Sequence, residues 1–215
     1  MDAELFILRI PAILLALTIH EFAHGWMAMK LGDPTARDAG RLTLNPVAHL
    51  DVVGALMLLW GPFGWAKPVP VNGYYFKKPK RDILLVSAAG PISNILLAFV
   101  LGSLHRILLV FSPELINSVP YLQQFLFLTI LLNLGISFFN LLPIPPLDGS
   151  KILLGMLPDK WIPVYLEKTK HVPLIFIALL VFDWIANKPV FSKYLFMFFE
   201  PYQAFWMHLI YGKLF

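Results

Sequence analysis

Two long uncharged stretches constrain the fold of this chain more than any other feature. No Asp, Glu, Lys or Arg occurs between Ile83 and Leu104 or between Tyr121 and Leu147. A third stretch, from Leu5 to Ile19, carries only Arg9, and its apolar character continues to Leu31. About 20 apolar residues in a helix cross the hydrocarbon core of a bilayer. We therefore expect three spanning helices, with lipid rather than water as the main solvent of the fold.

The whole chain is too apolar for a soluble domain. It is 58% hydrophobic and 14% charged, whereas soluble domains are roughly 45–50% apolar and about 25% charged. Residues 52–60 are apolar but too short to cross, which predicts a re-entrant or interfacial segment. Residues 172–213 suggest two further helices. We expect an all-α polytopic membrane protein: a bundle of about five spans in one membrane-embedded domain over residues 1–215, with its core at about 5–157.

The basic residues lie between the apolar segments rather than along one polar face. The loops at residues 30–51 and 62–82 share one side of the membrane if residues 52–60 only dip into it. These two loops carry Lys30, Arg37, Arg41, Lys67, Lys77, Lys78, Lys80 and Arg81. The opposite loop, at residues 105–120, offers only Arg106. The positive-inside tendency places the first two loops in the cytoplasm. A pI near 9.3 therefore reflects topology, and we expect no nucleic-acid partner.

Residues 20–24 read H-E-F-A-H, an H-E-x-x-H motif inside the first apolar stretch. Residues four apart share a helix face, so His20 and His24 can bind one zinc ion while Glu21 reaches its water. Such short motifs also arise by chance. However, an ionisable residue inside a spanning helix costs about 2.5–3.5 kcal/mol even on insertion scales, so three of them require a partner. With no cysteine in the chain, a metal must be held by His, Asp or Glu.

Asp148 is the candidate for a third metal ligand. It follows the uncharged run that ends at Leu147, in a proline-rich segment that cannot form a regular helix. An Asp before Gly is also common in turns and at helix N-caps. Topology favours the ligand, because the second span starts on the basic side and the third returns to it. Asp148 thereby comes back to the depth of His20 and His24.

Three motifs together resemble the site-2 protease family, in its short branch without a PDZ domain. They are H-E-F-A-H at residues 20–24, A-A-G-P-I-S-N at 88–94 and F-N-L-L-P-I-P-P-L-D-G at 139–149. The resemblance implies a zinc-dependent intramembrane protease that cuts transmembrane protein substrates. It implies one zinc ion on His20, His24 and Asp148, with Glu21 as the catalytic carboxylate. It further implies a multi-pass protein of a prokaryotic cytoplasmic membrane, with its active site towards the cytoplasm.

Three other polar residues have open roles. The resemblance suggests that Asn140 helps to hold the substrate, where its amide could stabilise an oxyanion, or it could make a structural hydrogen bond. Asn94 could contribute in the same way, although we favour helix packing beside the motif helix, since Gly90 and Ser93 are small. His49 could support the metal site from outside the ligand set by leaning on Asp51, or the two could form an ordinary interfacial contact.

Residues 41–44 and 65–71 show a strand-like alternation, which predicts short β-strands near the active site. Prolines at alternate positions of the second segment leave one strand edge able to pair with an extended substrate, although loop-spacing prolines explain them equally well. Two other classes compete with the protease. A catalytically inactive zinc-binding scaffold or regulator would usually have four protein ligands, and only three are found. A metal transporter would need ionisable residues along several spans. The sequence carries no signal for an oligomeric state.

Overall fold

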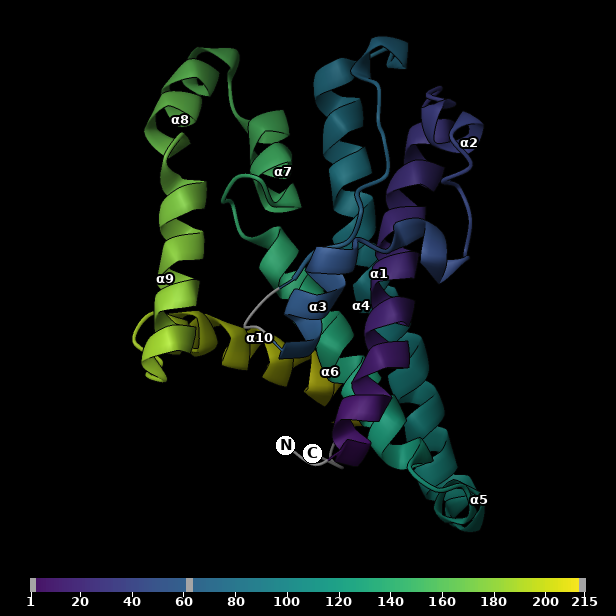
Figure 1. The fold of residues 1–215 in the computed structure, drawn as a ribbon. Helices are drawn as coiled ribbons and strands as arrows, with labels where there is room; N and C mark the ends of the chain where they lie inside the picture. The colour runs from purple at the N-terminus through teal and green to yellow at the C-terminus, as the bar shows by residue number, and fades with distance from the viewer. Residues whose placement is uncertain (1–2, 61–63, 213–215) are drawn as a thin grey trace.

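The computed structural model describes residues 3–60 and 64–212, and these form a helical protein without strands (Figure 1). Residues 1–2, 61–63 and 213–215 of the expected domain lie outside the described residues. The α-helices are α1 Ala3–Lys30, α2 Thr35–Asp38, α3 Val52–Trp60, α4 Pro79–Phe111, α5 Pro113–Ser118, α6 Leu122–Leu141, α7 Asp148–Met156, α8 Ile162–Thr169, α9 Val172–Ala186 and α10 Ser192–Tyr211. Three short 3-10 turns are η1 Pro46–His49, η2 Gly73–Tyr75 and η3 Asp159–Trp161.

Three helices are long and apolar enough to cross a membrane. They are α1, α4 and α6, the three spans that the uncharged stretches predict. Helix α9, together with the preceding η3 and α8, forms a pair bent by 41° that adds a fourth candidate span. The described part of the chain therefore has three or four candidate spans, and the expectation of about five is wrong. Helix α10 is not among the candidate spans, and Glu200 and Pro201 lie in the middle of its sequence.

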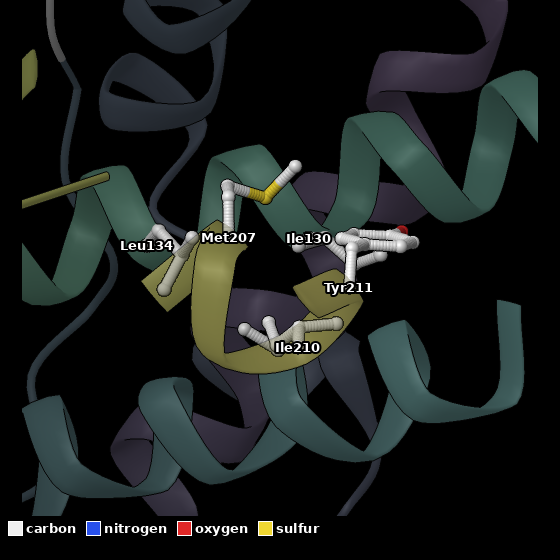
Figure 2. Packing of buried hydrophobic residues seen from close by; sticks show 6 residues of the cluster. Ile130, Leu134, Met207, Ile210 and Tyr211 are labelled. Carbon is white, nitrogen blue, oxygen red and sulfur yellow. The ribbon is translucent and has the colours of Figure 1, made fainter. Parts of the chain in front are cut away.

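Helix α4 is the centre of the bundle, because α1, α6 and α7 all pack against it. Helix α10 runs across these helices rather than alongside them (Figure 1). Its C-terminal turns form a buried apolar cluster with α4 and α6 (Figure 2). The cluster consists of Ala98, Ile130, Leu134, Met207, Ile210 and Tyr211. The second C-terminal helix is therefore present as expected, but it crosses the bundle instead of joining it as another span.

The bundle interior is polar where α1, α4 and α6 meet. Asn94 of α4 and Thr129, Asn133 and Ser137 of α6 are all completely buried. The three α6 residues are four positions apart, so they share one face of that helix. Lipid provides no hydrophobic drive for helix association, and spans instead associate through close packing and interhelical hydrogen bonds. On this polar face, Asn133 bonds Asn94 of α4 and Ser137 bonds Tyr202 of α10.

The expected β-strands are absent from the described residues. Residues 41–44 and 65–71 are extended or bent, but neither belongs to a ladder. Two donors of the second segment are already used: Lys67 N–H bonds the His49 carbonyl at 2.9 Å, and Val69 N–H bonds the Glu21 carboxylate at 2.8 Å. The prolines at 68 and 70 remove the donors of the other edge. Alternation in this segment therefore accompanies contacts to two different parts of the chain rather than strand pairing.

Helix α3 covers residues 52–60, as the short apolar run predicts, and is too short to span a bilayer. Asp51 accepts a hydrogen bond from Gly54 N–H at 2.8 Å and so caps the first turn of this helix. Val52, Val53 and Leu56 are exposed on its surface. The exposed apolar face is the feature expected of a segment that dips into lipid.

Candidate metal centre

Helix α1 carries both histidines of the H-E-x-x-H motif on one face. His20, Glu21 and His24 are buried, with 5%, 8% and 9% of their surfaces exposed. One helical turn separates the imidazoles, so their Nε2 atoms lie 3.1 Å apart. The motif is therefore deep inside the bundle rather than on the lipid-facing side of the span.

Asp148 lies beside the two histidines although it is far from them in the sequence. It is the first residue of α7, and its Oδ2 lies 3.2 Å from His20 Nε2 and 3.1 Å from His24 Nε2. Gly149 makes this approach possible, because a Cβ there would collide with the backbone oxygens of Leu141 and Leu142. The Asp148 side chain does not cap the helix. The carboxylate is thus directed at the imidazoles, not at its own backbone.

The three ligand atoms form a nearly equilateral triangle that suits zinc. Its sides are 3.1, 3.2 and 3.1 Å. Zinc bonds to imidazole nitrogen and carboxylate oxygen are about 2.0–2.2 Å long, and tetrahedral geometry then separates neighbouring ligand atoms by about 3.3–3.4 Å. The triangle needs to expand by only a few tenths of an ångström. His20, His24 and Asp148 could therefore hold one metal ion together, with a fourth position left for another ligand.

Hydrogen bonds on the far side of each ring prepare the imidazoles for a metal. His24 Nδ1 lies 2.7 Å from the Val86 carbonyl, which can only accept, so Nδ1 carries the proton. His20 Nδ1 lies 2.7 Å from Asn94 Oδ1. In neutral rings both Nε2 atoms then present lone pairs to each other and to Asp148. Such a convergence of acceptors is stable only with a cation or a proton between them.

Asp148 is held in its ionised form. Burial alone would raise the pKa of this carboxyl group, but when His20 and His24 carry a proton at Nε2, their hydrogen bonds and charge attraction outweigh burial and hold the pKa well below its usual value. Lys151, one helical turn along, has its Nζ 3.9 Å from Asp148 Oδ1. One carboxylate oxygen therefore faces the imidazoles while the other faces the lysine.

Glu21 lies beside the triangle and is held by the backbone of another segment. Its Oε2 accepts the hydrogen bond from Val69 N–H at 2.8 Å. This segment is fixed in turn by Arg41, whose Nη2 donates to the Lys67 carbonyl at 2.7 Å. The carboxylate next to the metal ligands is therefore positioned by a loop that follows α3, not only by its own helix.

Gly90 gives both imidazoles the space they occupy. A Cβ at this position would lie 2.5 Å from His24 Nε2 and 2.7 Å from His20 Cε1. Val86, Gly90 and Asn94 are four positions apart and so form one stripe of α4 facing α1. This stripe supplies a hydrogen-bond acceptor for each ring and a gap between them.

The structure brings together only some of the residues singled out in the sequence. Asn94 contacts His20 directly and packs α4 against α1, in keeping with the packing interpretation. Asn140 donates to the Ile136 carbonyl at 3.0 Å within its own helix. His49 Nε2 bonds the Thr43 carbonyl at 2.8 Å, and Asp51 caps α3, so these hydrogen bonds do not join the two residues to each other. The physical reason is that each has a nearer backbone partner.

Three contributors escaped the sequence interpretation: Val86, Val69 and Asn133. Val86 and Val69 act through backbone atoms, which no side-chain pattern can reveal. Asn133 did leave a signal, because it is a polar residue inside an uncharged span, four positions after Thr129. An amide in a spanning helix usually has a specific partner, since the bilayer offers none.

Comparison with known proteins gives consistent matches to metalloproteases. The model of peptidase family M50 matches residues 102–182. The chain is 46% identical over 147 residues to "Putative zinc metalloprotease YwhC" of Bacillus subtilis, which covers 68% of this chain and 67% of that protein. It is 36% identical over 160 residues to "Putative zinc metalloprotease Rip2" of Mycobacterium tuberculosis, covering 70% of this chain and 58% of that protein.

An archaeal relative matches over a larger share of both chains. "Putative zinc metalloprotease MJ0611" of Methanocaldococcus jannaschii is 29% identical over 181 residues, which is 83% of this chain and 82% of that protein. No solved structure gives a significant match. The similarity thus extends over bacterial and archaeal proteins.

Proposed function

Since this chain belongs to peptidase family M50, the site-2 protease family of zinc metalloproteases, we propose that it hydrolyses peptide bonds within or near transmembrane segments of membrane proteins. The observation that carries this proposal is the triangle of His20, His24 and Asp148. Three protein ligands leave one tetrahedral position for a water molecule or a substrate oxygen, as in catalytic zinc sites, whereas structural sites are usually closed by a fourth protein ligand.

Glu21 is the proposed general base and acid. Zinc, when bound, supplies a Lewis acid that makes a water molecule reactive near neutral pH. Glu21 takes the proton from that water and later gives it to the leaving nitrogen. The Val69 N–H keeps this carboxylate in place beside the ligands. Asn140 is the proposed substrate contact. It lies at the end of α6, the helix that precedes the segment leading to Asp148. Its amide carries a second proton besides the one that it donates to the Ile136 carbonyl.

The location of the motif supports a membrane-embedded substrate. Members of family M50 cleave membrane proteins, and His20 and His24 lie inside a candidate span. A transmembrane helix satisfies its own backbone groups, so a substrate must unwind locally before its peptide bond can be reached. Helix-breaking residues in the substrate should therefore increase the rate of cleavage.

The proposed setting is a prokaryotic cytoplasmic membrane with the site towards the cytoplasm. Lys30 ends α1 six residues after His24, and the following loop carries Arg37 and Arg41. By the positive-inside tendency this end of the span is cytoplasmic. We further propose that the whole chain forms one membrane-embedded domain, with the catalytic core ending near Leu157.

A cleavage assay with metal analysis tests the function. The purified protein is reconstituted with a single-pass membrane substrate, with and without a chelator. Glu21→Gln is expected to keep zinc and folding and to lose cleavage, whereas His24→Ala and Asp148→Asn are expected to lose zinc. An inactive zinc-binding scaffold would bind zinc but leave the substrate intact in the wild type. Normal proteolysis by the Gln variant would refute the role of Glu21.

A further inference from the structure

We propose that Asn133 of α6 is a positioning residue for zinc binding, which fixes the metal-ready form of His20 through Asn94. The inference rests on the proposed function insofar as His20 is taken to be a zinc ligand. The hydrogen bonds of the Asn133 side chain in the described structure go to Asn94 and to the Thr129 carbonyl, not to a metal ligand or to Glu21. Asn133 therefore acts on His20 indirectly, through Asn94, and from a different span.

A continuous chain of buried amide groups joins α6 to the metal site. Asn133 Nδ2 donates to the Thr129 carbonyl at 2.8 Å. Asn94 Nδ2 donates to Asn133 Oδ1 at 2.7 Å and to the Ala16 carbonyl at 3.0 Å. Asn94 Oδ1 then faces His20 Nδ1 at 2.7 Å. The chain crosses from α6 through α4 to α1, so all three spans contribute to one imidazole.

The direction of every bond in this chain follows from its two carbonyl ends. Backbone carbonyls accept and never donate, so the NH₂ group of Asn133 must face Thr129 and that of Asn94 must face Ala16. The oxygen of Asn133 is therefore turned towards Asn94, and the oxygen of Asn94 is turned towards His20. His20 must donate from Nδ1, which leaves Nε2 as the lone pair that faces His24 and Asp148.

Asn133 matters because a side-chain amide can flip. A flipped Asn94 would offer NH₂ to His20, which would then keep its proton on Nε2 and lose its capacity to bind a metal there. The Asn133 oxygen opposes this flip, since the flipped form would set it against another oxygen. Asn94 and Asn133 have no exposed surface, so water cannot rescue the mismatched contacts. Removing Asn133 leaves only the Ala16 carbonyl to hold the orientation.

Substitution at Asn133 is the direct test, with zinc affinity measured by chelator competition. Asn133→Leu removes the acceptor and is expected to weaken zinc binding about 10- to 100-fold, the usual effect of losing a group that orients a metal ligand. Asn133→Asp keeps an acceptor towards Asn94 and is expected to retain affinity within a few-fold. Ser137→Ala is the matched control: Ser137 is equally buried on the same face of α6, but its partner is Tyr202 of α10. It should leave affinity unchanged.

A double variant separates positioning from simple packing. A carboxylate at position 94 can accept from His20 but can never offer it NH₂. Asn94→Asp should therefore make Asn133 dispensable, and the Asn94→Asp/Asn133→Leu protein should recover most of the affinity lost by Asn133→Leu. If Asn133 served only to pack the helices together, the double variant would be at least as impaired as the single one, and the proposal would be overturned.

Nitrogen NMR of the metal-free wild type tests the same claim without any substitution. The ¹⁵N shifts of the His20 ring report which nitrogen carries the proton. A protonated Nδ1 is expected whether or not Nε2 shares a proton with Asp148; an unprotonated Nδ1 would overturn the proposal even if Asn133→Leu failed to fold. A folded Asn133→Leu protein with unchanged zinc affinity would also overturn it. None of these measurements needs substrate, so absence of cleavage by the wild type would refute the proposed function and leave this inference standing.

Discussion

The bundle of α1, α4, α6 and the first turn of α7 differs from the C-terminal helices α8 to α10 in how it is held together. In the bundle, buried polar groups bond to one another across helices and converge on one site. In the C-terminal part, rings carry the packing: Phe176 of α9 contacts Phe139 at 5.5 Å between centroids and Phe191 at 5.6 Å. Its polar links to the rest of the described chain include tyrosine hydroxyls, at Tyr165, Tyr202 and Tyr211, and the Arg106 guanidinium, which donates to the Ile210 carbonyl.

The difference shows what a membrane environment makes specific. A buried amide or imidazole has few acceptable partners in lipid, so its position fixes helix register and orientation. An aromatic ring can pack against many neighbours with little change in free energy. The bundle is therefore expected to tolerate few substitutions at the site, while the C-terminal helices should tolerate many. Four experiments test this contrast, from the largest expected effect to the smallest.

Gly90→Ala is expected to have the largest effect. Its Cβ would lie 2.5 Å from His24 Nε2, so the rings must move out of the triangle, and zinc affinity should fall more than 100-fold. Gly135→Ala of α6 is the matched control, because nothing lies within 4 Å of a Cβ there. Metal analysis of the two purified proteins makes the comparison. Zinc retained by the Gly90 variant would mean that the bundle is less rigid than its hydrogen bonds suggest.

Asn94→Leu should have the next largest effect. It removes the acceptor of His20 Nδ1, leaves the Asn133 oxygen without its donor, and removes the side-chain hydrogen bond to the Ala16 carbonyl. We expect a 10- to 100-fold loss of zinc affinity, together with about 1–3 kcal/mol of stability for the buried groups left unpaired. Chelator competition and thermal unfolding in detergent measure the two effects separately. If the variant lost stability but kept the zinc affinity of the wild type, Asn94 would be a packing residue without a role in metal binding.

Asp183→Ala tests the most polar contact of the C-terminal helices. The Asp183 carboxylate accepts hydrogen bonds from the backbone N–H groups of Val190, Phe191 and Ser192 and so fixes the turn from α9 to α10. Its removal should cost roughly 1–3 kcal/mol in thermal unfolding, with zinc affinity unchanged. Asp38→Ala, at an exposed ion pair with Arg37, should cost at most about 1 kcal/mol. A loss of zinc affinity in the Asp183 variant would mean that the C-terminal helices and the bundle are energetically coupled.

Tyr202→Phe should have the smallest effect. It removes the hydroxyl that lies 2.9 Å from Ser137 Oγ but keeps the ring between Phe138 and Phe199. We expect about 0.5–1.5 kcal/mol of stability to be lost, with zinc affinity and cleavage unchanged. Thermal unfolding beside the cleavage assay measures this. An effect as large as that of Asn94→Leu would contradict the division of the molecule into a specific and a tolerant region.

Much of the bundle could be predicted from sequence because its signals are local. The three spans follow from uncharged length, and His20 and His24 share a face because the helix repeats every 3.6 residues. The C-terminal helices were predicted as helices, but Lys193, Glu200 and Pro201 did not reveal that α10 would cross the bundle. The strand interpretation of residues 65–71 was wrong, because alternation describes where side chains point and not which partners the backbone finds.

Sequence alone determined that this chain is a membrane protein of helical spans and that a metal-binding motif lies inside the first of them. Both follow from the high free energy of charge and unpaired backbone in lipid. Only the tertiary structure decided that Asp148 meets the imidazoles, that Gly90 makes room for them, and that Asn133 is linked to His20. These facts depend on contacts between residues from 39 to 128 positions apart, and no local periodicity determines the relative placement of such residues.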